Sequence, residues 1–241
     1  MRVIRLYTTR KLVVDESIDL DEKPAHHAVN VLRMKEADEV TLFNGDGLEY
    51  SGVIQALSKK SVAVKVTSYQ PVNNESPLSV HLGQVISRGD KMDLTIQKAV
   101  ELGVTQITPL FSERCGVQLS GKRLEKKHQH WQQIVISACE QSGRARIPLV
   151  RQPVALKDWI NTDLGVHRVI LHPHLDRRLN MTESVDALTL LVGSEGGFSE
   201  EEVKMADQQG FNGFKLGPRI LRTETAALTA LAILQNRFGD L

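Results

Sequence analysis

The sequence predicts an α/β protein in two parts, a small all-β part followed by a larger part built on a mainly parallel sheet. Three observations carry this prediction. The first part of the chain holds short alternating segments and few helices. A stretch rich in proline and asparagine, residues 70–77, then interrupts the pattern. Beyond it, apolar strands alternate with helices. We therefore expect two domains, residues 1–72 and residues 73–241.

The first part is predicted from turn chemistry and strict alternation. Residues 39–44 alternate, the Asn-Gly-Asp-Gly run at 44–47 is typical of a turn, and residues 47–57 can return as a second strand. Residues 61–66 show the period of two that a half-buried strand requires. One short helix fits between Pro24 and Arg33. Short strands with so few helices favour a small barrel or a sandwich.

The second part alternates between strands and helices. Asp90 is expected to cap a helix with an apolar stripe, and Gly103 to end it. Two apolar strands, 167–171 and 188–192, are expected to be buried on both faces. The other elements predicted here are strands 78–86 and 104–111 and helices 120–141, from Ser199, and 225–238. This order predicts a mainly parallel sheet.

The composition excludes several classes of protein. The chain has 241 residues, 41% hydrophobic and 24% charged, with a net charge of +1. These values exclude a mostly disordered chain, a coiled coil and a nucleic-acid binder that acts through bulk charge, although a local basic face remains possible. Cys115 and Cys139 have no zinc-site or disulfide spacing, so we expect free thiols, a reducing cytoplasm and no metal. No apolar run predicts a membrane span or a signal peptide.

A glycine-rich loop follows the second apolar strand. Gly193, Gly196 and Gly197 would let the backbone approach a ligand closely, and the carboxyl end of a parallel strand is where α/β sheets bind ligands. Ser199 and Glu202 predict a capping box at the next helix. Glutamates at 195, 200, 201 and 202 would repel a phosphate, so the loop better suits a nucleoside without phosphates, or a cation. A tight turn that needs glycine only for its backbone angles remains the alternative.

A second stretch, residues 214–227, combines a strand end with charged residues. Arg219, Arg222 and Glu224 crowd into a loop before the last helix, for which Thr223 or Thr225 is the expected N-cap. An exposed helix start is the alternative explanation for these charges. The alanine-rich helix beyond fits a protein core, or close packing against a second subunit.

Basic residues form the third pattern. Spacings of four residues place Lys122 beside Lys126 and Arg123 beside Lys127 on the long helix. Together with basic residues elsewhere they could form an RNA-binding face, or simply an exposed surface. The full set expected at RNA is Arg2, Lys122, Arg123, Lys126, Lys127, Arg144 and Arg146.

At Gly193–Ser199 and Leu216–Ala226 the sequence resembles the bacterial 16S ribosomal RNA uridine N3-methyltransferases, members of the SPOUT, or knotted, methyltransferase superfamily. Lys98–Val104, Glu140–Arg144, Arg5 and His27–Met34 also match, so the resemblance covers essentially the whole chain. One departure is Ser194, where the family usually has proline.

The resemblance implies a PUA-like β-barrel for RNA at the N-terminus and a SPOUT α/β domain with a deep trefoil knot at roughly residues 167–230. It also implies a cytoplasmic homodimer with S-adenosylmethionine as cofactor and 16S ribosomal RNA, in the small subunit, as partner. The cofactor residues carried over are Leu171, His172, Gly193, Ser194, Glu195, Gly196, Gly197, Leu216, Gly217 and Leu221.

For catalysis, an arginine beside O2 or O4 of the uracil would stabilise the anion that forms when N3 loses its proton. Arg222 is the first candidate, and Arg5 or Arg10 from the partner subunit is the second. Glu224 is a candidate proton acceptor.

Three other functions remain open from the sequence. The chain could be a non-catalytic RNA-binding factor in ribosome assembly, or a SPOUT methyltransferase that acts on transfer RNA. A nucleotide-dependent oxidoreductase is the third, although the chain has no GxGxxG loop.

Overall fold

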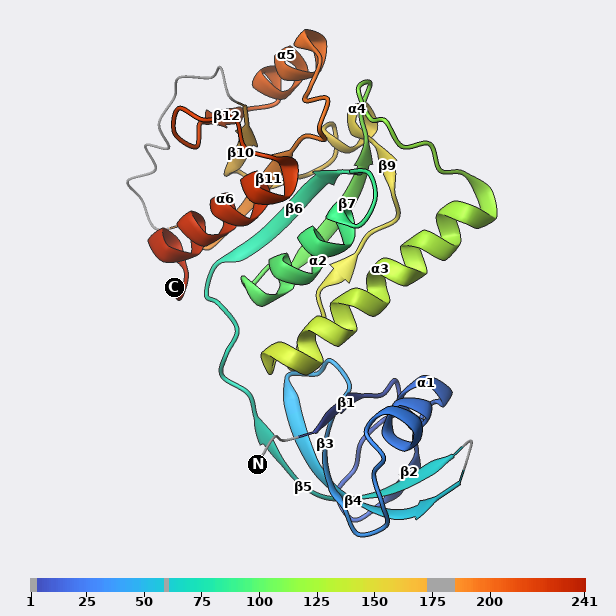
Figure 1. Cartoon of the computed structure of the whole chain (residues 1–241). Coiled ribbons are helices and arrows are strands. Elements are labelled where there is room, and N and C mark those ends of the chain that lie inside the picture. The colour runs from blue at the N-terminus through green and yellow to red at the C-terminus, as the bar shows by residue number, and fades with distance from the viewer. Residues whose placement is uncertain (1–3, 59–60, 173–184) are drawn as a thin grey trace. The chain divides into compact units, whose positions relative to one another are not determined.

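The computed structural model describes residues 4–58, 61–172 and 185–241 (Figure 1). The chain divides into two compact units. The first combines Met1–Glu75 with Cys139–Ile147, and the second combines Ser76–Ala138 with Pro148–Leu241. The expected domains 1–72 and 73–241 stay a prediction.

The first unit contains a five-stranded sheet in the order β1-β3-β4-β5-β2. Strand β1 runs parallel to β3, and the other neighbours are antiparallel. The strands are β1 Arg5–Tyr7, β2 Ser17–Asp19, β3 Glu39–Phe43, β4 Leu48–Leu57 and β5 Val62–Pro71, and the helices are α1 Glu22–His26 and the π-helix η1 His27–Val31.

Strand β5 shows the alternating burial that the sequence predicts for residues 61–66. Val62, Val64 and Val66 are fully buried, whereas the residues between them are partly exposed. The strand runs on to Pro71, into the stretch expected to be a linker, because β4 is long enough to pair with it as far as Leu48. Composition alone did not show that pairing.

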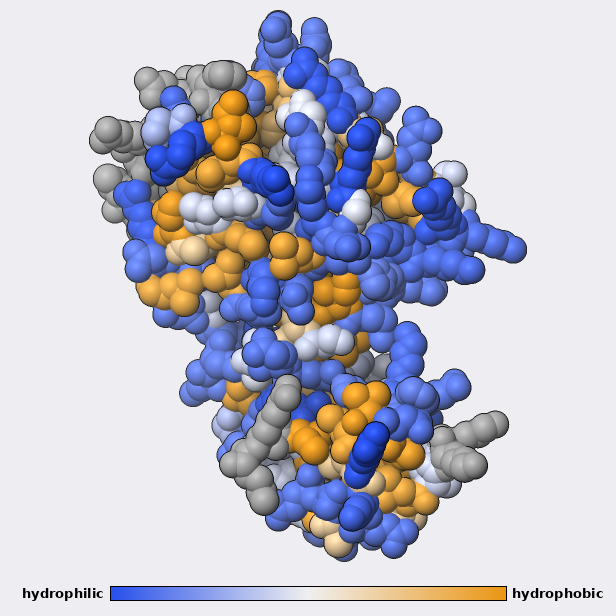
Figure 2. All heavy atoms as spheres, viewed as in Figure 1, coloured by the Kyte–Doolittle hydropathy of each residue, from blue (hydrophilic) through white to orange (hydrophobic). Residues whose placement is uncertain are grey.

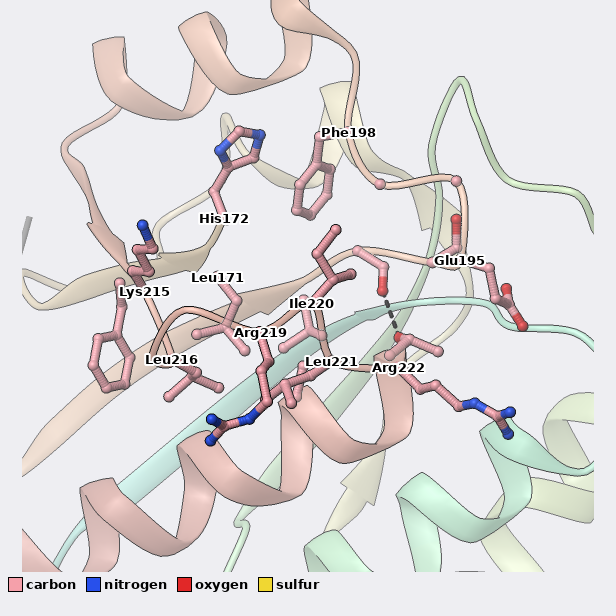
Figure 3. A pocket seen from close by; sticks show the side chains of 18 of the residues that line it. Leu171, His172, Glu195, Phe198, Lys215, Leu216, Arg219, Ile220, Leu221 and Arg222 are labelled. Carbon is pink, nitrogen blue, oxygen red and sulfur yellow. Dashed lines mark hydrogen bonds between the residues drawn. The ribbon is translucent and has the colours of Figure 1, made fainter. Parts of the chain in front are cut away.

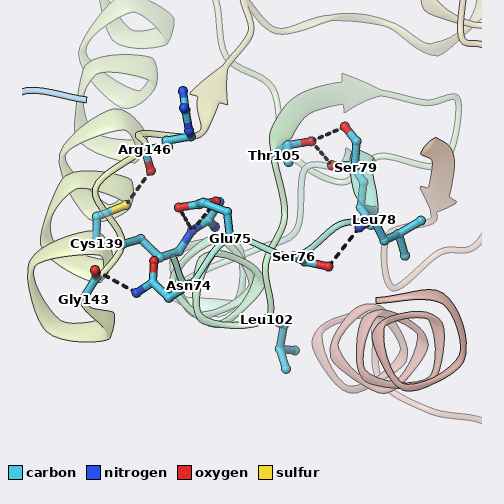
Figure 4. Close-up of polar contacts among 12 residues, drawn as sticks. Asn74, Glu75, Ser76, Leu78, Ser79, Leu102, Thr105, Cys139, Gly143 and Arg146 are labelled. Atoms are coloured by element: carbon cyan, nitrogen blue, oxygen red, sulfur yellow. Dashed lines mark hydrogen bonds and ion pairs between the residues drawn. The ribbon is translucent and has the colours of Figure 1, made fainter. Parts of the chain in front are cut away.

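The return segment Cys139–Ile147 is part of the first unit through specific bonds (Figure 4). Arg144 is 5% exposed, and its guanidinium binds the Glu75 carboxylate, with Nη2 2.5 Å from Oε2. Asn74 Nδ2 donates to the carbonyl of Gly143 at 2.8 Å. Arg5 Nη2 donates to the carbonyl of Arg144 at 3.2 Å. These bonds join segments that are far apart in the sequence.

The second unit is built on a parallel seven-stranded sheet, as predicted. Its order is β12-β10-β11-β6-β7-β8, and β9 also pairs with β7. The strands are β6 Ser79–Val85, β7 Gln106–Phe111, β8 Leu149–Val150, β9 Val154–Ala155, β10 Arg168–Leu171, β11 Ala187–Val192 and β12 Phe211–Phe214. The helices are α2 Lys91–Glu101, α3 Gly121–Ser142, α4 Leu156–Trp159, α5 Glu200–Gln208 and α6 Thr223–Phe238.

Two helix boundaries agree with the sequence. Helix α5 has the predicted capping box, in which the Glu202 N–H donates to Ser199 Oγ and the Ser199 N–H donates to the Glu202 carboxylate. Gly103 follows α2 with φ of +80°, the left-handed conformation that ends a helix. Asp90 is the N-cap residue of α2, but its side chain makes no capping bond.

The expected cap of α6 is wrong. Arg222 occupies the N-cap position, and Thr223 is already the first helical residue. The Thr223 hydroxyl bonds to the glycine loop instead, since it donates to the carbonyl of Gly193. Elements β8, β9 and α4 were not predicted because each is too short to show a period. Across the described residues, no helix combines the length and apolar character that crossing a bilayer requires.

Candidate active site

A pocket of about 530 Å³ opens at the carboxyl edge of the parallel sheet (Figure 3). Leu171, Val192 and Phe214, the last residues of β10, β11 and β12, lie on its wall. All ten predicted cofactor residues line it: Leu171, His172, Gly193, Ser194, Glu195, Gly196, Gly197, Leu216, Gly217 and Leu221. Two loops, 193–198 after β11 and 215–222 after β12, therefore meet at one cavity.

Close packing explains two glycines of the first loop. A Cβ at Gly196 would lie 2.7 Å from the carbonyl oxygen of Arg114, and one at Gly193 would lie 3.2 Å from the ring of Phe198. Ser194 is 7% exposed, and its hydroxyl donates to the same Arg114 carbonyl at 3.4 Å. Ser194, which departs from the family pattern, therefore bonds through its hydroxyl to the loop after β7.

Glu195 is ionised but has a partner. Its Oε1 accepts from Lys91 Nζ at 2.8 Å and from the backbone N–H of Arg88 at 3.3 Å. Partial burial raises the pKa of this carboxyl, but the hydrogen bonds and charge of Lys91 outweigh that effect and hold the pKa below its usual value. The Glu202 carboxylate is also engaged, since it accepts from the N–H of Glu113 as well as in the capping box.

A buried chain of hydrogen bonds connects the two loops. Gln84 Nε2 donates to Thr223 Oγ1 at 3.1 Å, and Thr223 Oγ1 donates to the carbonyl of Gly193 at 2.5 Å, the bond dashed in Figure 3. Gln84 is fully buried in β6, and Thr223 is 5% exposed. Because no water competes for these groups, they fix the start of α6 against the glycine loop.

Comparison with known proteins identifies the family. The model of an RNA methyltransferase domain matches residues 74–235, and that of an RNA methyltransferase PUA domain matches residues 20–67. A ribosomal RNA small subunit methyltransferase E from Buchnera aphidicola is 41% identical, with 100% of this chain and 98% of that protein covered. The chain belongs to this methyltransferase family. The predicted resemblance is confirmed, with a PUA-like domain before a methyltransferase domain in a mixed α/β fold.

Two solved relatives in the family carry a ligand. A protein from Legionella pneumophila, in complex with the bound cofactor S-adenosylmethionine, has a TM-score of 0.97 and 42% identity to this chain. A ribosomal RNA small subunit methyltransferase E from Neisseria gonorrhoeae, bound to S-adenosylmethionine, has a TM-score of 0.93 and 38% identity. Each comparison covers 100% of both chains.

The four candidate catalytic residues are in different places. Arg222 lines the pocket and is exposed. Glu224 does not line it, and its Oε2 is buried with no hydrogen-bond partner among the described residues. Arg5 and Arg10 belong to the first unit. Arg5 pairs with Glu49 and stacks on Phe43, and Arg10 Nε lies 3.3 Å from Asp21. Their predicted action from a partner subunit stays a prediction.

The residues expected at RNA do not form one set. Lys122, Arg123 and Lys126 are exposed at the start of α3, and Arg146 is exposed in the return segment. Lys127 is held by Asp93 at 3.0 Å. Arg144 is buried and its guanidinium pairs with Glu75, so it stabilises the first unit. Arg2 lies outside the described residues.

Several residues of the pocket carry no sequence pattern that predicts them. Arg114 comes from the loop after β7, Lys215 directly follows β12, and Ile220 is 86% exposed beside the cavity. Gln84 lies within strand β6, where no local pattern marks it. No local pattern marks these residues, because only the order of the strands brings them to one edge of the sheet.

The hydrogen-bond chain gives a testable prediction. In Thr223→Val, the Gly193 carbonyl and the Gln84 amide each lose a buried partner, which we expect to lower the free energy of unfolding by about 1–3 kcal/mol. Thr223→Ser keeps the hydroxyl and is the matched control. Urea unfolding of both variants measures the difference. Equal stability would show that the hydroxyl does not hold the loops together.

Proposed function

We propose that this protein transfers the methyl group of S-adenosylmethionine to N3 of a uridine in the decoding region of 16S ribosomal RNA, on the assembled small subunit, in the cytoplasm. The observation that carries the proposal is the pocket itself. It gathers all ten residues expected for the cofactor, and Arg222 lines the same cavity. The related structures with bound S-adenosylmethionine support the cofactor, and the related ribosomal RNA methyltransferases support the substrate class.

The pocket fits this cofactor. A volume of about 530 Å³ is in the range typical of small-molecule sites. The absence of side chains at Gly193 and Gly196 brings backbone groups to the cavity wall, where they can read an adenine edge. S-adenosylmethionine has no phosphate and carries a sulfonium cation, so the ionised Glu195 does not oppose it.

This cofactor would supply a methyl group on a sulfonium sulfur. That S–C bond would break as uridine N3 bonds to the methyl carbon, so a neutral thioether leaves, and the N3 proton would pass to solvent water. Loss of that proton spreads negative charge over O2 and O4 of the uracil. We propose that the Arg222 guanidinium, which lines the pocket, stabilises this charge and so lowers the barrier. The pocket would also position the base, which reduces the entropy cost of the reaction. Glu224 lies outside the lining, so we assign it no step.

Two structural expectations belong to the same proposal. The five-stranded sheet of the first unit would close as a PUA-like barrel, and residues 167–230 would form the trefoil knot. Membership of the methyltransferase family supports the knot, since it is the family resemblance that implies it. Residues 173–184 of this region lie outside the described part.

We also propose a homodimer, supported by exposed apolar side chains of the second unit. Leu94 on α2 is 43% exposed, Ile233 on α6 is 41% exposed, and α2 packs on α6. Figure 2 shows apolar side chains gathered over the α6 part of this unit. Light scattering should give twice the chain mass, and Ile233→Glu should shift the protein toward the monomer. A monomeric wild type would contradict the dimer.

The deciding experiment is methyl transfer to small ribosomal subunits that lack their own modification. Labelled S-adenosylmethionine supplies the methyl group, and mass spectrometry identifies the modified base. A single N3-methyluridine in 16S RNA is the expected product. Label found only in transfer RNA would identify transfer RNA as the substrate. Cofactor binding without methyl transfer to any RNA would contradict the assignment as an RNA methyltransferase. A chain that binds RNA but no cofactor would be a docking factor.

A further inference from the structure

Four cationic side chains line the active-site pocket. Arg114 comes from the loop after β7, Lys215 and Arg219 from the loop after β12, and Arg222 from the N-cap of α6. All four are exposed. Within residues 4–58, 61–172 and 185–241, no carboxylate forms an ion pair with any of them. The pocket mouth therefore carries an excess of positive charge.

The proposed cofactor does not account for this charge. S-adenosylmethionine has a sulfonium and an ammonium group but only one carboxylate, so it brings a single negative charge to four cations. Glu195, the acidic residue of the described lining, is already bonded to Lys91. Like charges around one cavity repel each other, and a polyanion relieves that repulsion. The phosphate backbone of RNA is the polyanion that the proposed reaction brings to this pocket.

The backbone that carries these cations is held in place. The Arg114 carbonyl packs against Gly196, where a Cβ would come within 2.7 Å, and accepts from Ser194 Oγ. Lys215 directly follows Phe214, which is 9% exposed at the end of β12. Figure 3 shows Lys215 and Arg219 on one side of the pocket and Arg222 on the other. The backbone therefore fixes the positions from which these side chains extend, on two sides of the cavity.

We infer that Arg114, Lys215 and Arg219 form a phosphate-binding rim that holds the nucleotides flanking the target base. The inference rests on the proposed function and assigns these residues a task separate from that of Arg222. Arg222 acts at the base, whereas the rim acts on the backbone and reads no sequence. Phosphate contacts release counterions, so the rim should determine how steeply substrate binding depends on salt.

The test measures KM for unmodified small subunits between 0.05 and 0.3 M KCl in Arg114→Gln, Lys215→Gln and Arg219→Gln. At about 0.15 M salt, each change should raise KM about three- to tenfold. It should also reduce the slope of log KM against log salt by about 0.7 to 1, with kcat unchanged. The affinity for S-adenosylmethionine, measured by calorimetry, should stay within twofold.

Arg151→Gln is the matched control. Arg151 is an exposed arginine near the amino edge of the same sheet, where it lines a separate cavity with Ser79 and His81. Its replacement should leave the salt slope unchanged.

Two results would overturn the rim. Salt slopes that match the wild type in all three variants would remove it. A loss of S-adenosylmethionine affinity in Arg114→Gln, with KM for the subunit unchanged, would assign that arginine to the cofactor carboxylate instead. Failure of the proposed function looks different, because the wild type would then transfer no methyl group to the subunit. In that case the slope is measured for equilibrium binding of the subunits, and it still decides whether the rim exists.

Discussion

Replacing Arg222 by alanine is expected to slow methyl transfer by about 10²- to 10³-fold, while S-adenosylmethionine binds with unchanged affinity. The expected size is that of removing one preorganised donor from a developing oxyanion. Arg222 lines the pocket with an exposed guanidinium, and the hydrogen bonds described between the two loops involve Gln84, Thr223 and Gly193, not its side chain. Single-turnover transfer with saturating substrate measures the chemical step, and calorimetry measures cofactor binding.

Arg222→Lys is the control, because it keeps the charge but loses the planar fork of donors. We expect it to recover only part of the rate. A rise of the apparent pKa in the pH–rate profile of Arg222→Ala would further support stabilisation of the uracil anion, since the N3 proton would then leave less readily. Wild-type turnover in the alanine variant would remove Arg222 from the mechanism.

Gly196→Ala is expected to weaken S-adenosylmethionine binding by at least about tenfold. The added methyl group would lie 2.7 Å from the carbonyl oxygen of Arg114 and 3.0 Å from its Cβ, so backbone must move. Forcing one extra carbon into packed structure typically costs about 1–3 kcal/mol. Here that cost falls on the loop that lines the pocket, and calorimetric titration with the cofactor reads it directly.

Ser194→Ala provides the comparison in the same loop. It removes one long hydrogen bond, 3.4 Å to the Arg114 carbonyl, and adds no atoms, so cofactor affinity should change less than threefold. Thermal unfolding of both variants separates a local loss of binding from a global loss of stability. Tight cofactor binding by Gly196→Ala would show that the loop after β7 yields easily and does not shape the pocket.

Patterns within a few residues of one another predicted several local features of the fold. The capping box of α5, the buried stripe of α2 and the glycine loop each depend on residues within a few positions of one another, and the structure confirms the first two. The last cap is the exception. A threonine before a helix usually caps it, but Thr223 is already the first helical residue, and its hydroxyl donates to the carbonyl of Gly193, thirty residues earlier. Tertiary contact decided that bond.

Charge was the least predictable property. From the sequence, Arg144 and Lys127 could belong to the same basic face, yet one is buried against Glu75 and the other is paired with Asp93. Arg114 showed no pattern at all, and it lies at the pocket because the end of β7 shares an edge with the end of β11. A linear sequence lists the charges but does not show which of them find partners.

The two-segment make-up of the first unit has a consequence for how the chain is made. Residues up to Glu75 leave the ribosome well before Arg144, which binds the Glu75 carboxylate and whose carbonyl accepts from Arg5. Until the later segment emerges, that carboxylate and the Arg5 donor lack these native partners. The N-terminal unit therefore completes its contacts late, after much of the methyltransferase domain has been synthesised. Bringing residues 139–147 back to the first 75 residues closes a long loop, which costs chain entropy and slows the docking of the later segment.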